Sequence, residues 1–284
     1  MHFFNTNGTG SSHAAGLRGN SADAMNGNAV YYKPGKLITM GGSTDYVNSA
    51  ATNRAFEVTV VPSPSSPTGY AASTREVGQM NFARTFHSSV VLPDGTVFVV
   101  GGMSFAKIFS DANAILTPEL YNPTTSTFRT LAPMSVPRTY HSVAILMQDG
   151  RVFVAGGGLC ARIGCAVNHF DAQIYTPPYL LKPDNTPAAR PVILQAPNFI
   201  KIRSTFQVQA SQASRYVIVR MGAATHSVNN DQRRTPLRTV STSGLTATVF
   251  VPAGTFTVLP GLHFLFAINP AGVPSIARVV KIGP

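Results

Sequence analysis

The 284-residue sequence has no tryptophan, only two cysteines, and half as many acidic as basic residues, 11 against 22. It also has no apolar run near the roughly 18 residues that a membrane-spanning helix needs, so we expect no membrane partner. The first five residues lack the charged start and apolar body of a secretion signal. Helical periodicity is equally scarce, and this favours a fold built from strands.

The shortage of acidic residues leaves a formal net charge of +11, which raises the question of an anionic partner such as nucleic acid. The basic residues are dispersed along the chain, and the one tight pair is Arg233-Arg234. No stacking-aromatic motif accompanies them. We therefore expect no nucleic-acid partner and interpret the charge as favouring solubility. The alternative is a basic nucleic-acid-binding module, which predicts salt-sensitive retention of the protein on a polyanion column.

The two cysteines, Cys160 and Cys165, lie close together in a glycine-rich segment. This spacing allows a small-loop disulfide, which suits an oxidising compartment, or two free thiols in a cytosolic protein. We predict the disulfide. The triplet Asn7-Gly8-Thr9 is a glycosylation sequon, although such triplets arise often by chance.

A repeat is the main feature that the sequence does contain. Residues 84–88 are Arg-Thr-Phe-His-Ser and residues 138–142 are Arg-Thr-Tyr-His-Ser, so the two copies differ by one phenolic oxygen. Each continues through an apolar run to a glycine pair, at Gly101-Gly102 and Gly156-Gly157, and residues 27–42 form a weaker third copy. Units of this size with short strands are typical of propeller blades, so the repeat predicts a β-propeller.

Each repeat unit also predicts a hairpin. The apolar run 88–92 turns at Pro93-Asp94-Gly95 and returns as residues 96–100, as expected for two buried strands. The glycine pair that follows can adopt backbone angles closed to other residues, so the chain can turn sharply where blades crowd together.

The pattern changes after Tyr179, because residues 182–191 are rich in proline, asparagine and alanine and have no apolar rhythm. We place a domain boundary there, with propeller blades in residues 1–180 and a second domain in residues 181–284. The second part contains five apolar strands separated by turns over about one hundred residues, which is typical of a β-sandwich. The sequence therefore predicts an all-β chain, a partial propeller followed by an immunoglobulin-like sandwich.

Tyr140, His141 and His226 are candidate metal ligands. Neighbouring side chains on a regular strand point to opposite faces, so Tyr140 and His141 can share an ion only where a strand starts irregularly. Pro137, just before them, is compatible with such a start. His226 lies in a polar stretch between two apolar strands that is too long for a tight turn.

Imidazole nitrogen and phenolate oxygen together suit copper(II). The alternative is that the three residues are packed or hydrogen-bonded without a metal. We interpret three other histidines as structural or surface residues, namely His87, His169 and His263.

Short sequence segments along essentially the whole chain resemble galactose oxidase and its fungal copper radical alcohol oxidase relatives, and they follow one another in the same order as in that family. Besides the two repeat copies they are Asp23-Ala24-Met25-Asn26-Gly27-Asn28-Ala29-Val30, Gly41-Gly42-Ser43-Thr44-Asp45-Tyr46, Gly156 to Cys160, Asn168-His169-Phe170-Asp171-Ala172-Gln173-Ile174, Thr225 to Arg234 and Asn269-Pro270-Ala271-Gly272-Val273-Pro274-Ser275. The resemblance implies kelch-type blades with one copper ion on the propeller axis, and a sandwich that sends a hairpin into that axis.

The resemblance also implies roles for single residues. Tyr140 matches the axial tyrosine, which accepts the substrate proton as general base, and His141 and His226 match the imidazole ligands of the copper ion. Tyr46 and Phe109 match positions that line the substrate cleft.

One position departs from the pattern. Val47 stands where galactose oxidase has a polar amide that helps hold the sugar. The resemblance therefore implies a less polar pocket, suited to aliphatic or aromatic primary alcohols.

The activity implied is oxidation of a primary alcohol, free or within a carbohydrate, to an aldehyde, with O2 reduced to H2O2, by a secreted, monomeric protein. The family's second redox group is a tyrosine thioether-linked to a cysteine, and both come from early blades. The match begins in the middle of the family's propeller, so we expect this chain to be an N-terminally truncated fragment without that Cys-Tyr cofactor and inactive alone. A non-catalytic kelch-type binding scaffold is the alternative.

Overall fold

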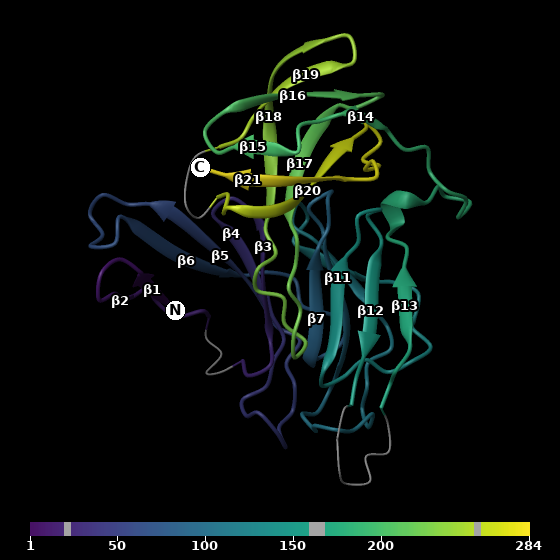
Figure 1. The fold of residues 1–284 in the computed structure, drawn as a ribbon. Coiled ribbons are helices and arrows are strands. Elements are labelled where there is room, and N and C mark those ends of the chain that lie inside the picture. The colour runs from purple at the N-terminus through teal and green to yellow at the C-terminus, as the bar shows by residue number, and fades with distance from the viewer. Residues whose placement is uncertain (20–23, 159–167, 253–256) are drawn as a thin grey trace.

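The computed structural model describes residues 1–19, 24–158, 168–252 and 257–284, and Figure 1 shows that these residues form sheets almost throughout. The one helical element among them is a single 3-10 turn, η1 (Pro178–Leu180). No described helix is long and apolar enough to cross a membrane. The prediction of an all-β chain is confirmed. Cys160 and Cys165 lie outside the described residues, so their disulfide stays a prediction.

Three antiparallel sheets follow one another as blades between residues 28 and 175 (Figure 1). The first contains β3 (Asn28–Lys33), β4 (Lys36–Met40), β5 (Ala55–Pro62) and β6 (Tyr70–Glu76). The second contains β7 (Thr85–Val91), β8 (Val97–Met103), β9 (Glu119–Asn122) and β10 (Thr127–Thr130), and the third contains β11 (Ser142–Leu146), β12 (Val152–Gly156) and β13 (Ala172–Tyr175). A separate hairpin of β1 (His2–Asn5) and β2 (Ser11–Ala14) precedes them.

The β7–β8 hairpin of the middle sheet is buried on both faces because its side chains alternate between two cores. Every residue of β7 and β8 is buried. Val97 and Val99 pack in the core shared with the first sheet, whereas Phe98 and Val100 pack in the core shared with the third. Successive side chains of a strand point to opposite faces, and here each face packs against a neighbouring blade. Every position is therefore buried, which explains why the sequence of the hairpin is a continuous apolar run.

The repeated arginine links the strands of each blade. Arg84 is fully buried, and its guanidinium donates to the carbonyl of Gly101 and forms an ion pair of 2.8 Å with Glu119 at the start of β9. Arg138, its equivalent, donates to the carbonyl of Gly156 and pairs at 2.7 Å with Asp171, just before β13. The same five-residue word therefore occurs twice because it makes the same cross-strand contacts twice.

Beyond residue 190 the chain forms one curled eight-stranded sheet, ordered β14-β16-β19-β18-β17-β20-β21-β15. Its strands are β14 (Ile193–Gln195), β15 (Phe199–Lys201), β16 (Thr205–Ala210), β17 (Arg215–Arg220), β18 (Arg234–Ser243), β19 (Thr246–Phe250), β20 (Gly261–Ile268) and β21 (Arg278–Gly283). β18 pairs with β17 through its first half and with β19 through its second, with a register shift between Thr239 and Ser241. The sheet thus folds over its own core, and the predicted sandwich is confirmed.

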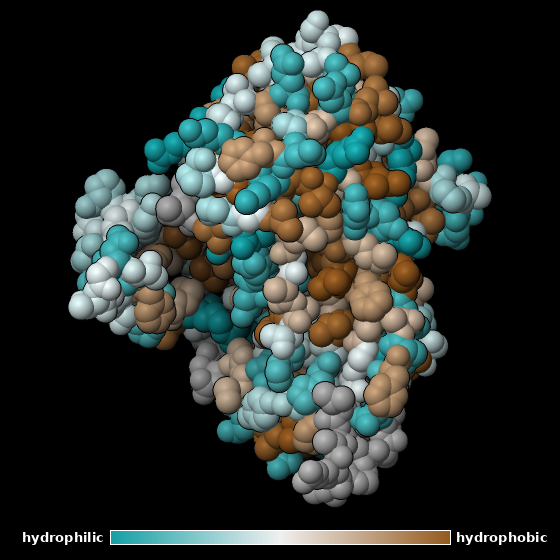
Figure 2. All heavy atoms as spheres, in the orientation of Figure 1, coloured by the Kyte–Doolittle hydropathy of each residue, from teal (hydrophilic) through white to brown (hydrophobic). Residues whose placement is uncertain are grey.

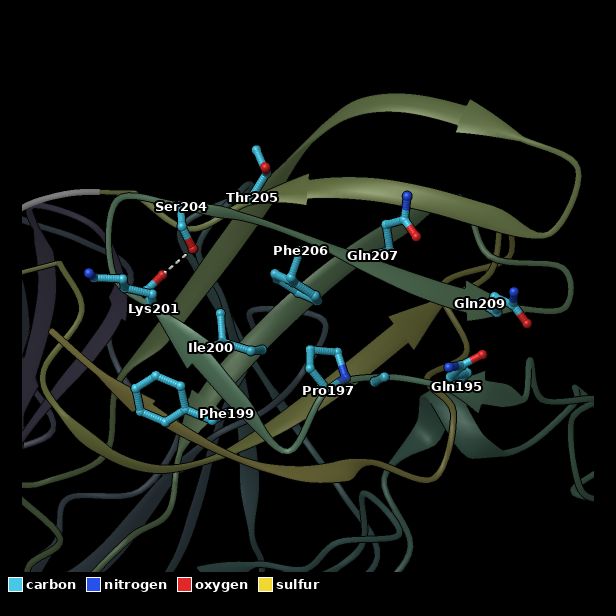
Figure 3. Close-up of a pocket in the computed structure, with 11 residues that line it drawn as sticks. Gln195, Pro197, Phe199, Ile200, Lys201, Ser204, Thr205, Phe206, Gln207 and Gln209 are labelled. Carbon is cyan, nitrogen blue, oxygen red and sulfur yellow. Dashed lines mark hydrogen bonds between the residues drawn. The ribbon is translucent and has the colours of Figure 1, made fainter.

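Two hollows flank these layers. Figure 3 shows an open groove between β15 and β16, with Ile200, Phe206 and Pro197 in its middle. Figure 2 shows a second hollow, between the arm that carries β5 and β6 and the body of the molecule, with hydrophobic side chains inside it. Tyr31 and Leu37 line that second hollow.

His87, in β7, is fully buried, and neither ring nitrogen has a hydrogen-bond partner among the described residues. Burial, and to a smaller extent the nearby Arg84 charge, together lower the pKa of His87 from 6.5 to about 3. The unfolded chain therefore binds a proton at His87 that the folded chain does not bind between about pH 6.5 and pH 3. The stability that this residue confers is complete above pH 6.5 and is lost as the pH falls.

We expect His87→Gln to flatten the acid side of the stability profile. Between pH 7 and pH 4 the parent protein should lose on the order of 3 kcal/mol more unfolding free energy than the variant, because only the parent must bury a charge or unfold. Urea unfolding at pH 7, 5.5 and 4 measures the difference. Parallel profiles for the two proteins would show that His87 is hydrated or charged in the fold.

Candidate metal centre

Tyr140 and His141 occupy a turn immediately before β11 rather than a regular strand. His141 has a φ of 67°, in the left-handed region that costs a non-glycine residue free energy. This backbone turns both side chains to the same side, and the two rings stack with centroids 3.8 Å apart. The structure therefore shows the irregular strand start that a shared ion requires.

The segment that carries His226 leaves the sandwich between β17 and β18 and runs down between β3 and β7 (Figure 1). The Gln232 amide fixes its stem, because its oxygen accepts from the Val91 N–H and its nitrogen donates to the Ser89 carbonyl, both at 2.7 Å. Ser227 fixes the tip, where its N–H donates to the Ser142 carbonyl at 3.1 Å. These contacts explain why a polar stretch of the second domain projects in one defined direction.

The tip places the His226 ring next to the other two candidates. Its centroid lies 4.9 Å from that of His141 and 6.3 Å from that of Tyr140. His226 is exposed and the other two rings are half-buried, so the centre is open to solvent on one side. Two imidazoles and one phenol, from two separate parts of the fold, thus meet at one place.

Hydrogen bonds from neighbouring groups orient the two imidazole rings. The Nδ1 atom of His141 lies 2.9 Å from the carbonyl of Gly158, and because a carbonyl only accepts, Nδ1 carries the proton and Nε2 the lone pair. The Nδ1 atom of His226 lies 2.7 Å from the Thr225 hydroxyl. With each Nδ1 atom engaged in a hydrogen bond, the Nε2 atoms are the nitrogens placed to bind a metal, and a hydrogen bond on the opposite nitrogen is typical of metal-binding histidines.

This donor set fits copper(II). Two neutral imidazoles and a phenolate are borderline ligands of the type that copper(II) binds strongly, and the exposed side leaves room for a further ligand. The described residues contain no group of three or more histidine, cysteine, aspartate or glutamate side chains arranged to hold a metal. Within the described ranges, the third ligand of the candidate centre, beside the two imidazoles, is therefore the phenol of Tyr140.

Tyr46 and Phe109, the predicted substrate-cleft residues, both lie at this centre. The Tyr46 hydroxyl donates a hydrogen bond of 2.9 Å to the Tyr140 oxygen. Burial, and then the hydrogen bond to Tyr140, raise the pKa of Tyr46 to about 12. The Phe109 ring centroid lies 5.3 Å from that of Tyr140 and 5.9 Å from that of His141, with 38% of the residue exposed.

Phe86 is a residue of the centre that sequence reasoning missed. It is buried, and its ring centroid lies 5.1 Å from that of Tyr140 and 5.6 Å from that of Tyr46. The signal was present, because Phe86 occupies in one repeat the position that Tyr140 occupies in the next. Two equivalent positions of neighbouring blades therefore meet at the centre.

His169 is structural, as predicted, and it supports the loop that carries Phe109. Its Nε2 atom lies 2.9 Å from a carboxylate oxygen of Asp111. The Thr139 hydroxyl also donates to the carbonyl of Ser110 in that loop. His169 and Thr139 thus hold this loop at Asp111 and Ser110.

Comparison with known proteins agrees with this geometry. Residues 23–180 match the family described as glyoxal oxidase N-terminus, and residues 190–282 match the galactose oxidase-like early set domain. A galactose oxidase from Gibberella zeae is 42% identical over 290 aligned residues, covering 99% of this chain and 42% of that protein. The aldehyde oxidase GLOX of Vitis pseudoreticulata is 32% identical and is covered to 43%, over 74% of this chain.

A solved structure extends the similarity to the whole fold. A fungal alcohol oxidase of the AA5 family, in complex with copper, superposes with a TM-score of 0.93 at 39% identity, covering all of this chain and 59% of that one. This chain thus spans about two fifths of the length of the two relatives above. The sequence words, the two matched family regions and the fold agree, and the chain belongs to the galactose oxidase and glyoxal oxidase family.

Proposed function

We propose that this chain supplies the copper-binding part of the active centre of an alcohol oxidase. The reaction is oxidation of a primary alcohol to an aldehyde, with the two electrons and two protons passed to O2 to give H2O2. The meeting of Tyr140, His141 and His226 is the observation that carries the proposal. The names of the relatives, which include a galactose oxidase and an alcohol oxidase bound to copper, support it.

His141 and His226 hold the metal through their Nε2 atoms. Their Nδ1 atoms are occupied by Gly158 and Thr225, so neither ring can rotate without losing a hydrogen bond. Bound copper would accept one electron from the alcohol, and the Cys-Tyr radical that the resemblance implies for the full-length family would accept the second.

Tyr140 is the proposed general base. Its phenolic oxygen, on a half-buried ring beside the exposed His226, would accept the hydroxyl proton of the alcohol. Tyr46 supports this role, because a phenol with a pKa of about 12 stays protonated at neutral pH and keeps donating to the Tyr140 oxygen.

The surroundings of the centre favour an apolar alcohol as substrate. The exposed ring of Phe109 and the buried ring of Phe86 flank Tyr140, and Val47 follows Tyr46 directly. None of these three side chains can hydrogen-bond to a sugar hydroxyl. We therefore propose aliphatic or aromatic primary alcohols ahead of sugars as substrates. From the family resemblance we also propose that the protein is monomeric and acts outside the cell.

The chain by itself does not contain the family's second redox group. Its only cysteines are Cys160 and Cys165, which the proposed disulfide uses. A thioether to tyrosine needs a further cysteine. We propose that the 284-residue chain holds copper(II) but does not turn over.

We expect the purified, copper-loaded 284-residue protein to produce no sustained peroxide from primary alcohols. A peroxidase-coupled assay with 1-butanol, benzyl alcohol and galactose in air measures this, with an active oxidase of the family as the positive control. Many turnovers per copper would contradict the proposal that the second redox group is missing. A copper-free preparation separates metal-dependent signal from background.

A further inference from the structure

The β1–β2 hairpin carries the one N-x-S/T triplet of the sequence in which x is not proline, Asn7-Gly8-Thr9. Asn5 pairs with Ser11, so the triplet lies in the turn that joins the two strands, and every residue of this turn is exposed. In Figure 1 the hairpin lies beside β6, away from β7 to β13 and from the segment that carries His226. The triplet is therefore a feature separate from the proposed metal centre.

The turn presents the asparagine in an ordered way. The N–H of Asn7 donates to the Asn5 side-chain oxygen at 3.0 Å, and the N–H of Gly10 donates to the carbonyl of Asn7 at 3.1 Å. Gly8 and Gly10 have φ angles of 59° and 76°, which glycine adopts without strain. The Asn7 amide and the Thr9 hydroxyl therefore both stand on an exposed hairpin tip, the surface setting that N-glycosylation requires.

An unusually exposed aromatic ring stands three residues before Asn7. Phe4 is 73% exposed, although a phenylalanine ring on a strand normally packs against the protein. It lines a hollow of about 400 Å³ between the hairpin and the β5–β6 turn, together with Asn7, His13, Pro67 and Tyr70. An N-acetylglucosamine ring has one face of C–H groups, and covering an aromatic face with it removes apolar area of both from water.

We propose that Asn7 is an N-glycosylation site and that its first sugar packs on the exposed ring of Phe4. The Asn7 amide nitrogen forms the new C–N bond to the anomeric carbon of a lipid-linked oligosaccharide diphosphate. The sugar–phosphate bond breaks, the lipid diphosphate leaves, and the amide loses one proton. The proposal rests on the proposed extracellular location and does not depend on copper.

The modification is tested with the full 284-residue chain behind a cleavable secretion leader in a yeast host. We expect the secreted protein to carry one N-glycan, seen as a mass shift that endoglycosidase treatment removes and that peptide mapping places on Asn7. Asn7→Gln and Thr9→Ala should abolish the shift, and Thr9→Ser should keep it. Cell-free translation with microsomes gives the same readout if secretion is poor. An unmodified Asn7 in translocated protein overturns the proposal.

The packing on Phe4 has its own test, by hydrogen exchange of the hairpin amides in the glycosylated protein and in Asn7→Gln. With Phe4 present, we expect the glycan to slow exchange in residues 2–5 and 11–14 by about twofold to fivefold. In the Phe4→Ala background the glycan should have no such effect, although the modification itself remains. Equal slowing in both backgrounds overturns the contact. If Asn7 is glycosylated but the protein does not bind copper, only the proposed function fails. If the protein binds copper but Asn7 stays unmodified, only this proposal fails.

Discussion

Replacement of Glu119 by alanine is expected to lower the free energy of unfolding by about 3–5 kcal/mol, because it leaves a charged guanidinium alone in the interior. The side chains of Glu119 and Arg84 are both fully buried, and their charged groups lie 2.8 Å apart. Burial already lowers the pKa of Arg84, which shows that its charge is poorly solvated. Without the carboxylate, only neutral acceptors such as the Gly101 carbonyl remain, and these offset much less of the cost of keeping that charge away from water.

Glu119 has a second role that adds to this loss. Its other oxygen accepts from the backbone N–H and the side-chain amide of Asn81, and the first oxygen also accepts from the N–H of Phe82. These groups belong to the segment that leads into β7. The alanine variant removes this acceptor, and the loss adds to the cost because the three hydrogen bonds are partly shielded from water.

Urea unfolding of the parent and the variant at pH 7 measures the difference. Asp171→Ala is the matched control, since Asp171 makes the equivalent pair with Arg138 but its carboxylate is half exposed to water. We expect a clearly smaller loss there, because water can replace the missing partner. The double replacement Arg84→Met with Glu119→Leu should recover much of the stability. Equal losses for Glu119→Ala and Asp171→Ala would contradict the role of burial.

The blades were predictable because their signals are local. The run 88–92, the turn at Pro93-Asp94-Gly95 and the run 96–100 lie next to one another in the chain, and they became the β7–β8 hairpin. Burial on both faces makes such strands continuously apolar, and a repeated unit shows the same pattern again. Local words of this kind need no knowledge of distant contacts.

The contacts that complete the site were not predictable in this way. Tyr46 and Tyr140 are 94 positions apart, and nothing in either segment states that one hydroxyl donates to the other. The direction of the His226 segment depends on Gln232 binding backbone groups of β7, more than 140 positions away. The resemblance supplied the ligand set, and the repeat offered a signal for Phe86, whereas the hydrogen bond from Tyr46 came from the three-dimensional structure alone.

Replacement of His226 by alanine is expected to weaken copper(II) binding by about 100-fold or more, because it removes a direct ligand, and loss of outer-shell partners alone typically costs 10- to 100-fold. His141→Ala should have a similar effect. Tyr140→Phe should weaken binding less and abolish any phenolate-to-copper absorption band, because it removes the one oxygen ligand and keeps both imidazoles. Titration followed by isothermal calorimetry and by electron paramagnetic resonance measures affinity and the number of coordinated nitrogens.

Two features of the chain sharpen that titration. His87→Gln is the matched control, because His87 is the repeat equivalent of His141 but is buried away from the centre, so its variant should bind copper(II) like the parent. The N-terminal amine and His2 offer a second set of nitrogen ligands for copper(II), so every protein should also carry His2→Gln. If Tyr140→Phe, His141→Ala and His226→Ala then all match the parent, the three rings do not bind copper. The scaffold interpretation, in which the repeats serve only to bind a partner, would replace the oxidase proposal.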